Sequence, residues 1–370
     1  MSRIPTVQTE LGLRSGVLGI TLLAIALGSL VSMPLTGALI HRYGSRACST
    51  WTTLAFCAAL ALIPLATGPV SLGVLLFVYG AAAGAMDVSM NSQGVTVERF
   101  YGGRSIMSSF HALFSVGGMI GSALGGQIAA AGVSEETHFA VSAAVNGVMA
   151  AAVAGLMIGP AHEPVHESSP MFALPRGPLL PLGALGFCFL LAEGAIADWT
   201  AIYLRDAIHA TPAGAASGYA VFSAAMSAAR FAGDYVTDKF GAVHVIRVGG
   251  LAAAVGLMAA LLSPSLLPAL AGLFVVGLGY AAIVPNVFGA AGRIPGIPPS
   301  AGIAAVTTMG FTGFLIGPPL MGWIAEWTSL RTALFVLVGL SLGGSLLAGA
   351  VRAARGLGTR THGEVLDVHG

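Results

Sequence analysis

Asp87 and Asn91 place a carboxylate and an amide within the stretch GAMDVSMNSQG, residues 84–94, which otherwise holds small or uncharged side chains. Inserting a charged side chain at the centre of a membrane helix costs roughly 2.5 to 3.5 kcal/mol, so such residues usually face an interior site. In a helix, Asn91 and Glu98 share a face with Asp87. A carboxyl group in a site of low dielectric can bind and release a proton as its access to water changes. We therefore predict that Asp87 couples to protons in a central cavity, with a buried structural hydrogen bond as the alternative.

Four further polar residues lie inside apolar segments and could line the same cavity. Glu193 could add a second carboxylate, or be solvated near the membrane surface. His111 titrates near neutral pH and could relay a proton, or it could face water at the start of its helix. Gln127 and Asn286 could each contact a solute or form a hydrogen bond between helices.

The composition places these residues in a membrane protein. Of 370 residues, 56% are hydrophobic and 8% are charged, against roughly 25% charged in soluble domains. Long apolar runs near the ~20 residues that span a bilayer recur along the chain. The net charge of +1 includes no basic block that could bind nucleic acid.

Enzyme and metal chemistry are not indicated. The three cysteines lie in apolar runs without metal-ligand spacing. HEPVH, residues 162–166, matches the zinc-protease pattern, but Pro164 and the Pro- and Ser-rich surroundings oppose the stable helix that this pattern needs. We therefore predict no catalytic residues, no metal and no cofactor.

Breaks in the apolar runs predict the helices and their grouping. Eleven segments are expected: about 17–40, 48–67, 71–95, 106–131, 139–159, 178–200, 214–236, 243–262, 266–290, 301–325 and 331–351. The long polar stretch AHEPVHESSPMFALPRGP divides them into an N-terminal bundle, residues 1–160, and a C-terminal six-helix bundle, residues 178–351. Residues 161–177 are the expected linker and 352–370 an expected disordered tail.

The Lys and Arg distribution predicts the orientation in the membrane. If HRYGSR is cytoplasmic, only Arg3, Arg14, Arg205 and Arg331 of the 16 basic residues fall on the other side. This asymmetry agrees with the positive-inside rule and predicts a cytoplasmic C-terminus.

An internal repeat relates the two halves. HRYG at residue 41 matches DKFG at residue 238, an offset of 197, and Gly80 matches Gly277 at the same offset. Gly117 and Gly121 match Gly313 and Gly317 at an offset of 196. Residues 178–197 have no counterpart in the first half, so eleven helices of an expected twelve are seen. We expect that Met1 is an internal start and that a first helix belongs to the protein.

Two six-helix halves with a charged motif after the second helix of each resemble the major facilitator superfamily. The family motif, roughly G-x-x-x-D-R-x-G-x-R, is matched in GALIHRYGSR by Gly37, Arg42, Gly44 and Arg46, with His41 in place of the acid. RFAGDYVTDKFG supplies Arg230, Asp234, Asp238, Lys239 and Gly241. The resemblance implies that these residues form a conformational latch on the cytoplasmic side.

Two further resemblances concern the transported compound. MDVSMNSQGVTV resembles the fourth-helix motif of fucose-permease-type sugar transporters, which implies proton coupling at Asp87 and sugar contact at Asn91. GGMIGSALGG resembles the fifth-helix motif of drug/proton antiporters through Gly117, Gly121, Gly125 and Gly126. These glycines, together with Gly313 and Gly317, are first expected to pack helices closely. FHALFSVGGMIGSALGG and AEGAIADW are similar to a bacterial branch grouped with the rhizopine-associated membrane protein, which implies a bacterial inner membrane.

These observations predict a secondary transporter that works by alternating access. We expect it to move a small, neutral polar or sugar-like solute with protons, as a monomer in the lipid bilayer without a nucleic-acid partner. Three alternatives stay open: proton-antiport efflux of an amphipathic compound, a non-transporting membrane sensor, and a truncated inactive form.

Overall fold

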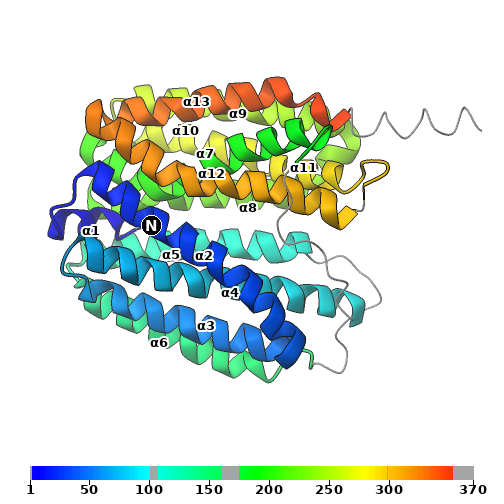
Figure 1. The fold of residues 1–370 in the computed structure, drawn as a ribbon. Helices are drawn as coiled ribbons and strands as arrows, with labels where there is room; N and C mark the ends of the chain where they lie inside the picture. Colours follow the sequence, from blue (N-terminus) through cyan, green and yellow to red (C-terminus); the bar gives the residue numbers. More distant parts are fainter. Residues whose placement is uncertain (1, 101–106, 160–174, 298, 353–370) are drawn as a thin grey trace, which may run out of the picture.

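The computed structural model describes residues 2–100, 107–159, 175–297 and 299–352, which form helices and connecting turns without strands (Figure 1). The HEPVH stretch, most of the expected linker and nearly all of the expected tail therefore lie outside the described residues. The helices are α1 Ile4–Glu10, α2 Ser15–Tyr43, α3 Ser45–Leu62, η1 Ile63–Leu65, α4 Pro69–Phe100, α5 Met107–Ala130, α6 Glu135–Ala154, α7 Leu179–Ile208, α8 Pro212–Phe240, α9 Ala242–Leu262, α10 Leu266–Tyr280, α11 Ile283–Ala291, α12 Pro299–Trp327 and α13 Leu330–Leu347.

Most of these helices have the length and hydropathy of membrane spans. Within the described residues, 10 spans qualify, and α10 and α11 together make one of them, Leu266–Ala291. The helix α8 is 29 residues long but is not among them. It is rich in Ala, Ser and Gly and carries charged residues in its last turns. We therefore treat the chain as a polytopic membrane protein in which α8 is an interior helix.

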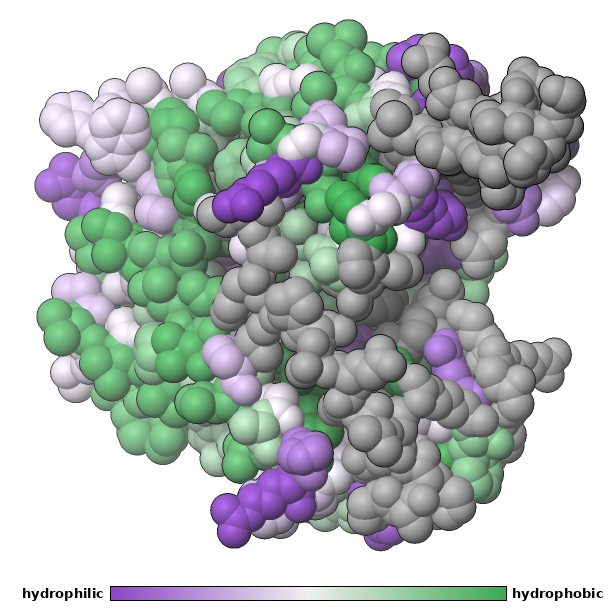
Figure 2. Space-filling view, turned by 45° about the vertical axis from the view of Figure 1, so that its right-hand side comes forward, coloured by the Kyte–Doolittle hydropathy of each residue, from purple (hydrophilic) through white to green (hydrophobic). Residues whose placement is uncertain are grey.

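The helices form two groups that lie side by side. Figure 1 shows α7–α13 in the upper part of the view and α2–α6 in the lower part. The groups meet where α5 packs on α8 and where α2 packs on α12. Figure 2 shows hydrophobic side chains over much of the lateral face on the left of the view, as expected for a face that contacts lipid. The interior between the groups is thus bounded by these two helix pairs.

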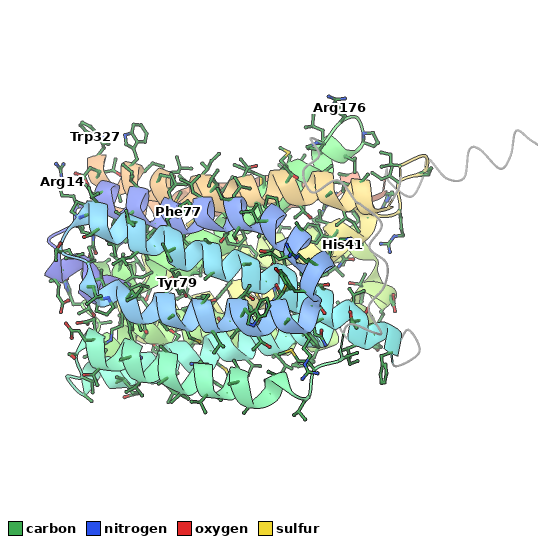
Figure 3. The ribbon with its side chains drawn as sticks, turned by 60° about the horizontal axis from the view of Figure 1, so that its bottom comes forward. Arg14, His41, Phe77, Tyr79, Arg176 and Trp327 are labelled. Atoms are coloured by element: carbon green, nitrogen blue, oxygen red, sulfur yellow. The ribbon has the colours of Figure 1, made fainter. Side chains whose placement is uncertain are left out.

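The two ends of the helix bundle carry different residues. Figure 3 shows Arg14 and Trp327 at one end, which also carries α1, and His41 and Arg176 at the other. We call the first the α1 end and the second the Gly44 end, because Gly44 joins α2 to α3 there. Gly44 has φ +83° and the repeat-related Gly241 has φ +80°, a backbone conformation that glycine adopts without steric cost. This shared turn geometry explains why the motif glycine recurs in both halves.

The repeat is also visible at the α1 end. The helices α2 and α8 each have 29 residues and start at positions related by the same offset. Gly12 before α2 has φ +58°, and His209 before α8 has φ +57°. By this offset, the seven residues of α1 correspond to Ala201–Ala207, the last turns of α7. The short helix α1 therefore takes the place that the end of α7 takes in the other half.

Repeat-related glycines have different surroundings in the two halves. A Cβ on Gly313 would lie 2.7 Å from the carbonyl oxygen of Phe187 in α7, and one on Gly317 would lie 3.6 Å from that of Leu191. At Gly117 and Gly121 of α5, a Cβ would meet no described atom within 4 Å. The close helix packing expected at these two positions is therefore not seen among the described residues. The reason is that α12, the repeat counterpart of α5, has α7 packed against this face, whereas no described helix covers the corresponding face of α5.

The α2–α4 crossing gives a sharp test of glycine packing. A Cβ on Gly80 would collide with the backbone carbonyl of Ile25. We expect Gly80→Ala to destabilise the protein by about 1–3 kcal/mol, because the two backbones have to separate. The matched change Gly117→Ala, on an open face, should have little effect. Thermal unfolding in detergent measures both, and equal melting temperatures for the two variants would contradict the packing seen here.

Candidate functional site

Asp87 and Asn91 lie on one face of α4, as their spacing predicted. Both side chains are partly buried. The Asn91 Nδ2 group donates hydrogen bonds to the backbone oxygen of Asp87 at 2.8 Å and to its Oδ1 at 3.1 Å. This amide thus helps to orient the carboxyl group without adding a charge of its own. A neutral donor of this kind is compatible with both the ionised and the protonated form of the acid.

Gln93 is a polar residue of the same stretch that was not among the predicted site residues. Its side chain is buried, and its Oε1 accepts a hydrogen bond from Ser45 Oγ of α3 at 2.5 Å. Its Nε2 donates to the carbonyl oxygen of Ile158, beyond α6, at 3.2 Å. Gln93 therefore ties α4 to both neighbours and positions the turn that carries Asp87 and Asn91. Its place in the unusually polar stretch is the signal that could have identified it.

Glu193 and Arg230 form a charged pair in the interior. Glu193 lies near the middle of α7, and its Oε1 is 3.7 Å from Nη2 of Arg230 in α8. The side chains are 25% and 17% exposed, respectively. The Nη1 group of Arg230 donates to Ser115 Oγ of α5 at 2.6 Å. One guanidinium thus connects three helices, two from one half and one from the other.

This position changes the interpretation of Arg230. The motif resemblance implied a place in the latch, close to Asp238 and the loop before α9. In the structure its guanidinium instead reaches the middle of α7 and the facing helix α5. The reason is that Arg230 precedes the end of α8 by almost three turns. The side chain of Asp234 lies outside the described residues.

The α5–α8 contact brings more polar groups to this interface. Ser122 Oγ donates to the carbonyl oxygen of Ala216 at 2.8 Å. A Cβ on Gly118 would lie 3.4 Å from the hydroxyl oxygen of Tyr219 and 3.5 Å from Ser223 Oγ. Tyr219 and Ser223 were not predicted, because neither stands out in the Ala- and Ser-rich sequence of α8. Together with Glu193 and Arg230, they give the interface hydroxyl groups and one charge of each sign.

The remaining predicted cavity residues are placed elsewhere. Asn286, near the start of α11, donates to Thr237 Oγ1 of α8 at 3.0 Å and to the carbonyl oxygen of Ala282 at 2.8 Å. These contacts match the interhelical alternative. Gln127 is exposed near the end of α5. The side chain of His111 lies outside the described residues. The structure therefore brings together Glu193, Arg230 and Ser115, and separately Asp87 and Asn91.

The other residues predicted to form the latch lie at the Gly44 end. Gly37 and Arg42 belong to the last turns of α2, Arg46 begins α3, and Asp238 and Lys239 end α8. The Arg42 guanidinium lies 5.2 Å from the ring centre of Tyr43, and the Lys239 ammonium lies 5.4 Å from that of Phe240. The ion pairs found among the described side chains involve none of Arg42, Arg46, Asp238 and Lys239.

Comparisons with known proteins agree with this architecture. The model of the Major Facilitator Superfamily matches residues 1–296 and 182–363. An uncharacterised MFS-type transporter of Yersinia pestis is 36% identical over 330 residues, which cover 89% of this chain and 85% of the relative. The membrane protein MosC of Rhizobium meliloti is 33% identical over 344 residues, covering 92% and 82%.

Solved structures show the same fold at low sequence identity. A mutant form of the nucleoside transporter NupG superimposes with a TM-score of 0.70 at 15% identity, covering 95% of both chains. A bacterial homologue of the human lysosomal transporter Spinster, in an inward-facing and unoccupied conformation, gives 0.72 at 14% identity, covering 96% of this chain and 92% of that one.

Proposed function

The chain belongs to the Major Facilitator Superfamily, and we propose on that basis that it moves a small, neutral polar or sugar-like solute together with protons. The two helix groups would rock about the interior so that the site opens to one side at a time. Protonation of Asp87 would change which of the two states is favoured. This function requires an acid that titrates during the cycle, and the geometry of Asp87 supports that role.

The single observation that carries the proposal is the contact of Asp87 with Asn91. The Asn91 amide can donate to Asp87 whether the carboxyl group is ionised or protonated, because the backbone oxygen of Asp87 is an acceptor in both cases. Proton transfer can therefore occur without loss of the local helix structure. The hydroxyl groups of Ser115, Tyr219 and Ser223 at the α5–α8 interface would suit a neutral solute that offers several hydrogen bonds.

The basic residues support an orientation for this movement. With most Lys and Arg residues in the cytoplasm, the Gly44 end and the C-terminus would be cytoplasmic, and the α1 end would face outward across a bacterial inner membrane. We propose that the protein acts as a monomer, since one chain supplies both helix groups, the Asp87–Asn91 contact and the Glu193–Arg230 pair.

A second candidate is proton-antiport efflux of an amphipathic compound. The observation that favours it is the close α5–α8 contact, where a Cβ on Gly126 of the glycine motif would lie 2.5 Å from Ala216 Cβ. This contact couples α5 tightly to the other half, as a coupling motif in antiporters would require. It does not specify the direction of transport.

Flux measurements distinguish the two functions. Protein in vesicles would be given an inward proton gradient, and uptake of radiolabelled neutral sugars and polyols would be compared with movement of a cationic dye. We expect accumulation of a neutral solute that collapses on addition of a protonophore. Dye expulsion that is driven by the inward proton gradient would support the second candidate. Solute movement at the same rate with and without the gradient would contradict proton coupling.

A further inference from the structure

The helices α2 and α12 touch through their backbones at the α1 end. A Cβ on Gly19 would lie 2.5 Å from the carbonyl oxygen of Pro318, and one on Gly322 would lie 2.5 Å from that of Ser15. The two helices belong to different halves of the repeat. Figure 3 shows Arg14, just before α2, and Trp327, the last residue of α12, at this end. Any outward opening of the interior therefore has to separate this contact.

Glu326 joins these two helix ends through polar contacts. Its Oε2 accepts a hydrogen bond from the backbone N–H of Gly16 at 3.1 Å, and its Oε1 forms an ion pair with Arg14. Glu326 is 18% exposed and Arg14 is 78% exposed. Because an exposed ion pair contributes little in water, the bond to the helix N-terminus is the more important of the two contacts.

The N-terminus of α2 has no cap of its own. Arg14 occupies the N-cap position and makes no capping bond with its side chain, since a guanidinium has no acceptor. The repeat-related N-cap of α8 is Thr211, whose Oγ1 accepts from the backbone N–H of Gly214 at 3.2 Å. In α8 the cap is thus local and independent of the other half. In α2 the acceptor comes from the other half.

We propose that Glu326 is a clasp that caps α2 only while the α1 ends of the two halves are together. Opening this end would withdraw the acceptor from Gly16, so the free energy of the cap favours the state closed at the α1 end. The cap of α8 is local and is kept in both states, so it adds no such bias. This inference rests on the rocking motion proposed above but involves neither solute nor protons.

A second contact at the same end acts in the same direction. Arg205 of α7 donates from Nη1 to the carbonyl oxygen of Pro5 at 2.5 Å and from Nη2 to Gln8 Oε1 at 2.8 Å. These bonds join α1, on the N-terminal side of the repeat, to α7 of the C-terminal half. Since they do not involve α2, their presence should keep the Glu326 variants folded with the α1 end partly closed.

Distances between spin labels test the clasp directly. The label pairs are Leu65 with Leu262 at the α1 end and Tyr43 with Phe240 at the Gly44 end, all exposed and related by the repeat. They would be introduced as cysteines in a background without the three native cysteines. We expect Glu326→Ala to raise the ratio of open to closed α1 ends on the order of fivefold, as the loss of one cap implies. The Gly44-end distance should shorten in the same fraction of molecules.

Glu136→Ala is the matched control, because Glu136 is an exposed carboxylate in the first turn of α6, whose N-cap Ser134 is local. This variant should match the wild type. An unchanged distance distribution in Glu326→Ala would overturn the proposal. Glu326→Met, which removes the acceptor but keeps the length of the side chain, serves if the alanine variant does not fold, and an unchanged distribution there would overturn the proposal as well. Glu326→Gln, which keeps an acceptor for Gly16, should show a smaller shift than either, and a shift as large as that of Glu326→Ala would also contradict the cap.

Arg14→Thr combined with Glu326→Ala separates a clasp from local fraying. The threonine can cap α2 from its own N-cap position, as Thr211 caps α8. If Glu326 acts between the halves, the double variant stays open at the α1 end. A return to the wild-type distribution would show that only the first turn of α2 had been destabilised, and would overturn the proposal. Neither result depends on solute flux, so the role of Asp87 is tested separately.

Discussion

Asp87→Asn is expected to abolish proton-driven accumulation of solute while leaving solute exchange across the membrane intact. The amide has nearly the same shape as the carboxyl group and can still contact Asn91, but it cannot bind a proton reversibly. With one proton per solute, a pH gradient of one unit supports roughly tenfold accumulation, because about 1.4 kcal/mol corresponds to a factor of ten. The variant should therefore show no accumulation above equilibrium.

The measurement compares driven uptake with counterflow in the same vesicles. Asp206→Asn is the control, since Asp206 is a carboxylate that is 52% exposed at the end of α7 and pairs with its neighbour Arg205. This control should keep both activities. Driven uptake that survives in Asp87→Asn would exclude Asp87 as the proton-coupling residue, and loss of both activities would assign it to solute binding or structure instead.

Arg230→Ala is expected to produce the second large effect, on both stability and transport. The change removes the cationic partner of Glu193 near the middle of α7 and removes the hydrogen bond that Arg230 donates to Ser115. Removing one partner of a fully buried ion pair costs about 3–5 kcal/mol, but the 3.7 Å separation and partial exposure of this pair reduce the expected loss to roughly 1–3 kcal/mol. Transport should fall because the contact between α5 and α8 is weakened.

A double-mutant cycle separates the charge effect from the loss of packing. Adding Glu193→Gln to Arg230→Ala removes the unpaired charge and should recover part of the thermal stability in detergent. Arg247→Ala, at an exposed position on α9, is the matched control and should change neither property. If the double variant is as unstable as the sum of the two single variants, Glu193 and Arg230 do not interact energetically.

Helix positions were largely predictable because each helix follows a continuous apolar run. The expected segment 243–262 matches α9, Ala242–Leu262, and 266–290 matches α10 and α11, which together end at Ala291. Prediction was poorest where a helix continues past its apolar run. The segment 71–95 becomes α4, Pro69–Phe100, because backbone hydrogen bonds continue a helix regardless of side-chain polarity.

The candidate site was predictable only where its residues share one helix. The spacing of Asp87 and Asn91 specifies their contact, since residues four apart in a helix lie on the same face. Glu193, Arg230 and Ser115 come from three helices, and their contact depends on the rotation and tilt of each. The sequence does not specify the rotation or tilt of a helix. Arg230 was therefore assigned to the latch from its motif, although its guanidinium reaches α7 and α5 in the structure.

The sequence by itself determined that this is an all-helical membrane protein of two repeated halves, because hydropathy, helix period and repeat offset are properties of the chain. The tertiary structure decided which faces meet. Gly117 and Gly313 occupy equivalent positions, yet only Gly313 is packed against another described helix. Likewise, Arg14 and Thr211 are equivalent N-cap positions, yet α2 takes its cap from Glu326. These contacts depend on the neighbours that each helix finds in three dimensions, which local sequence patterns do not encode.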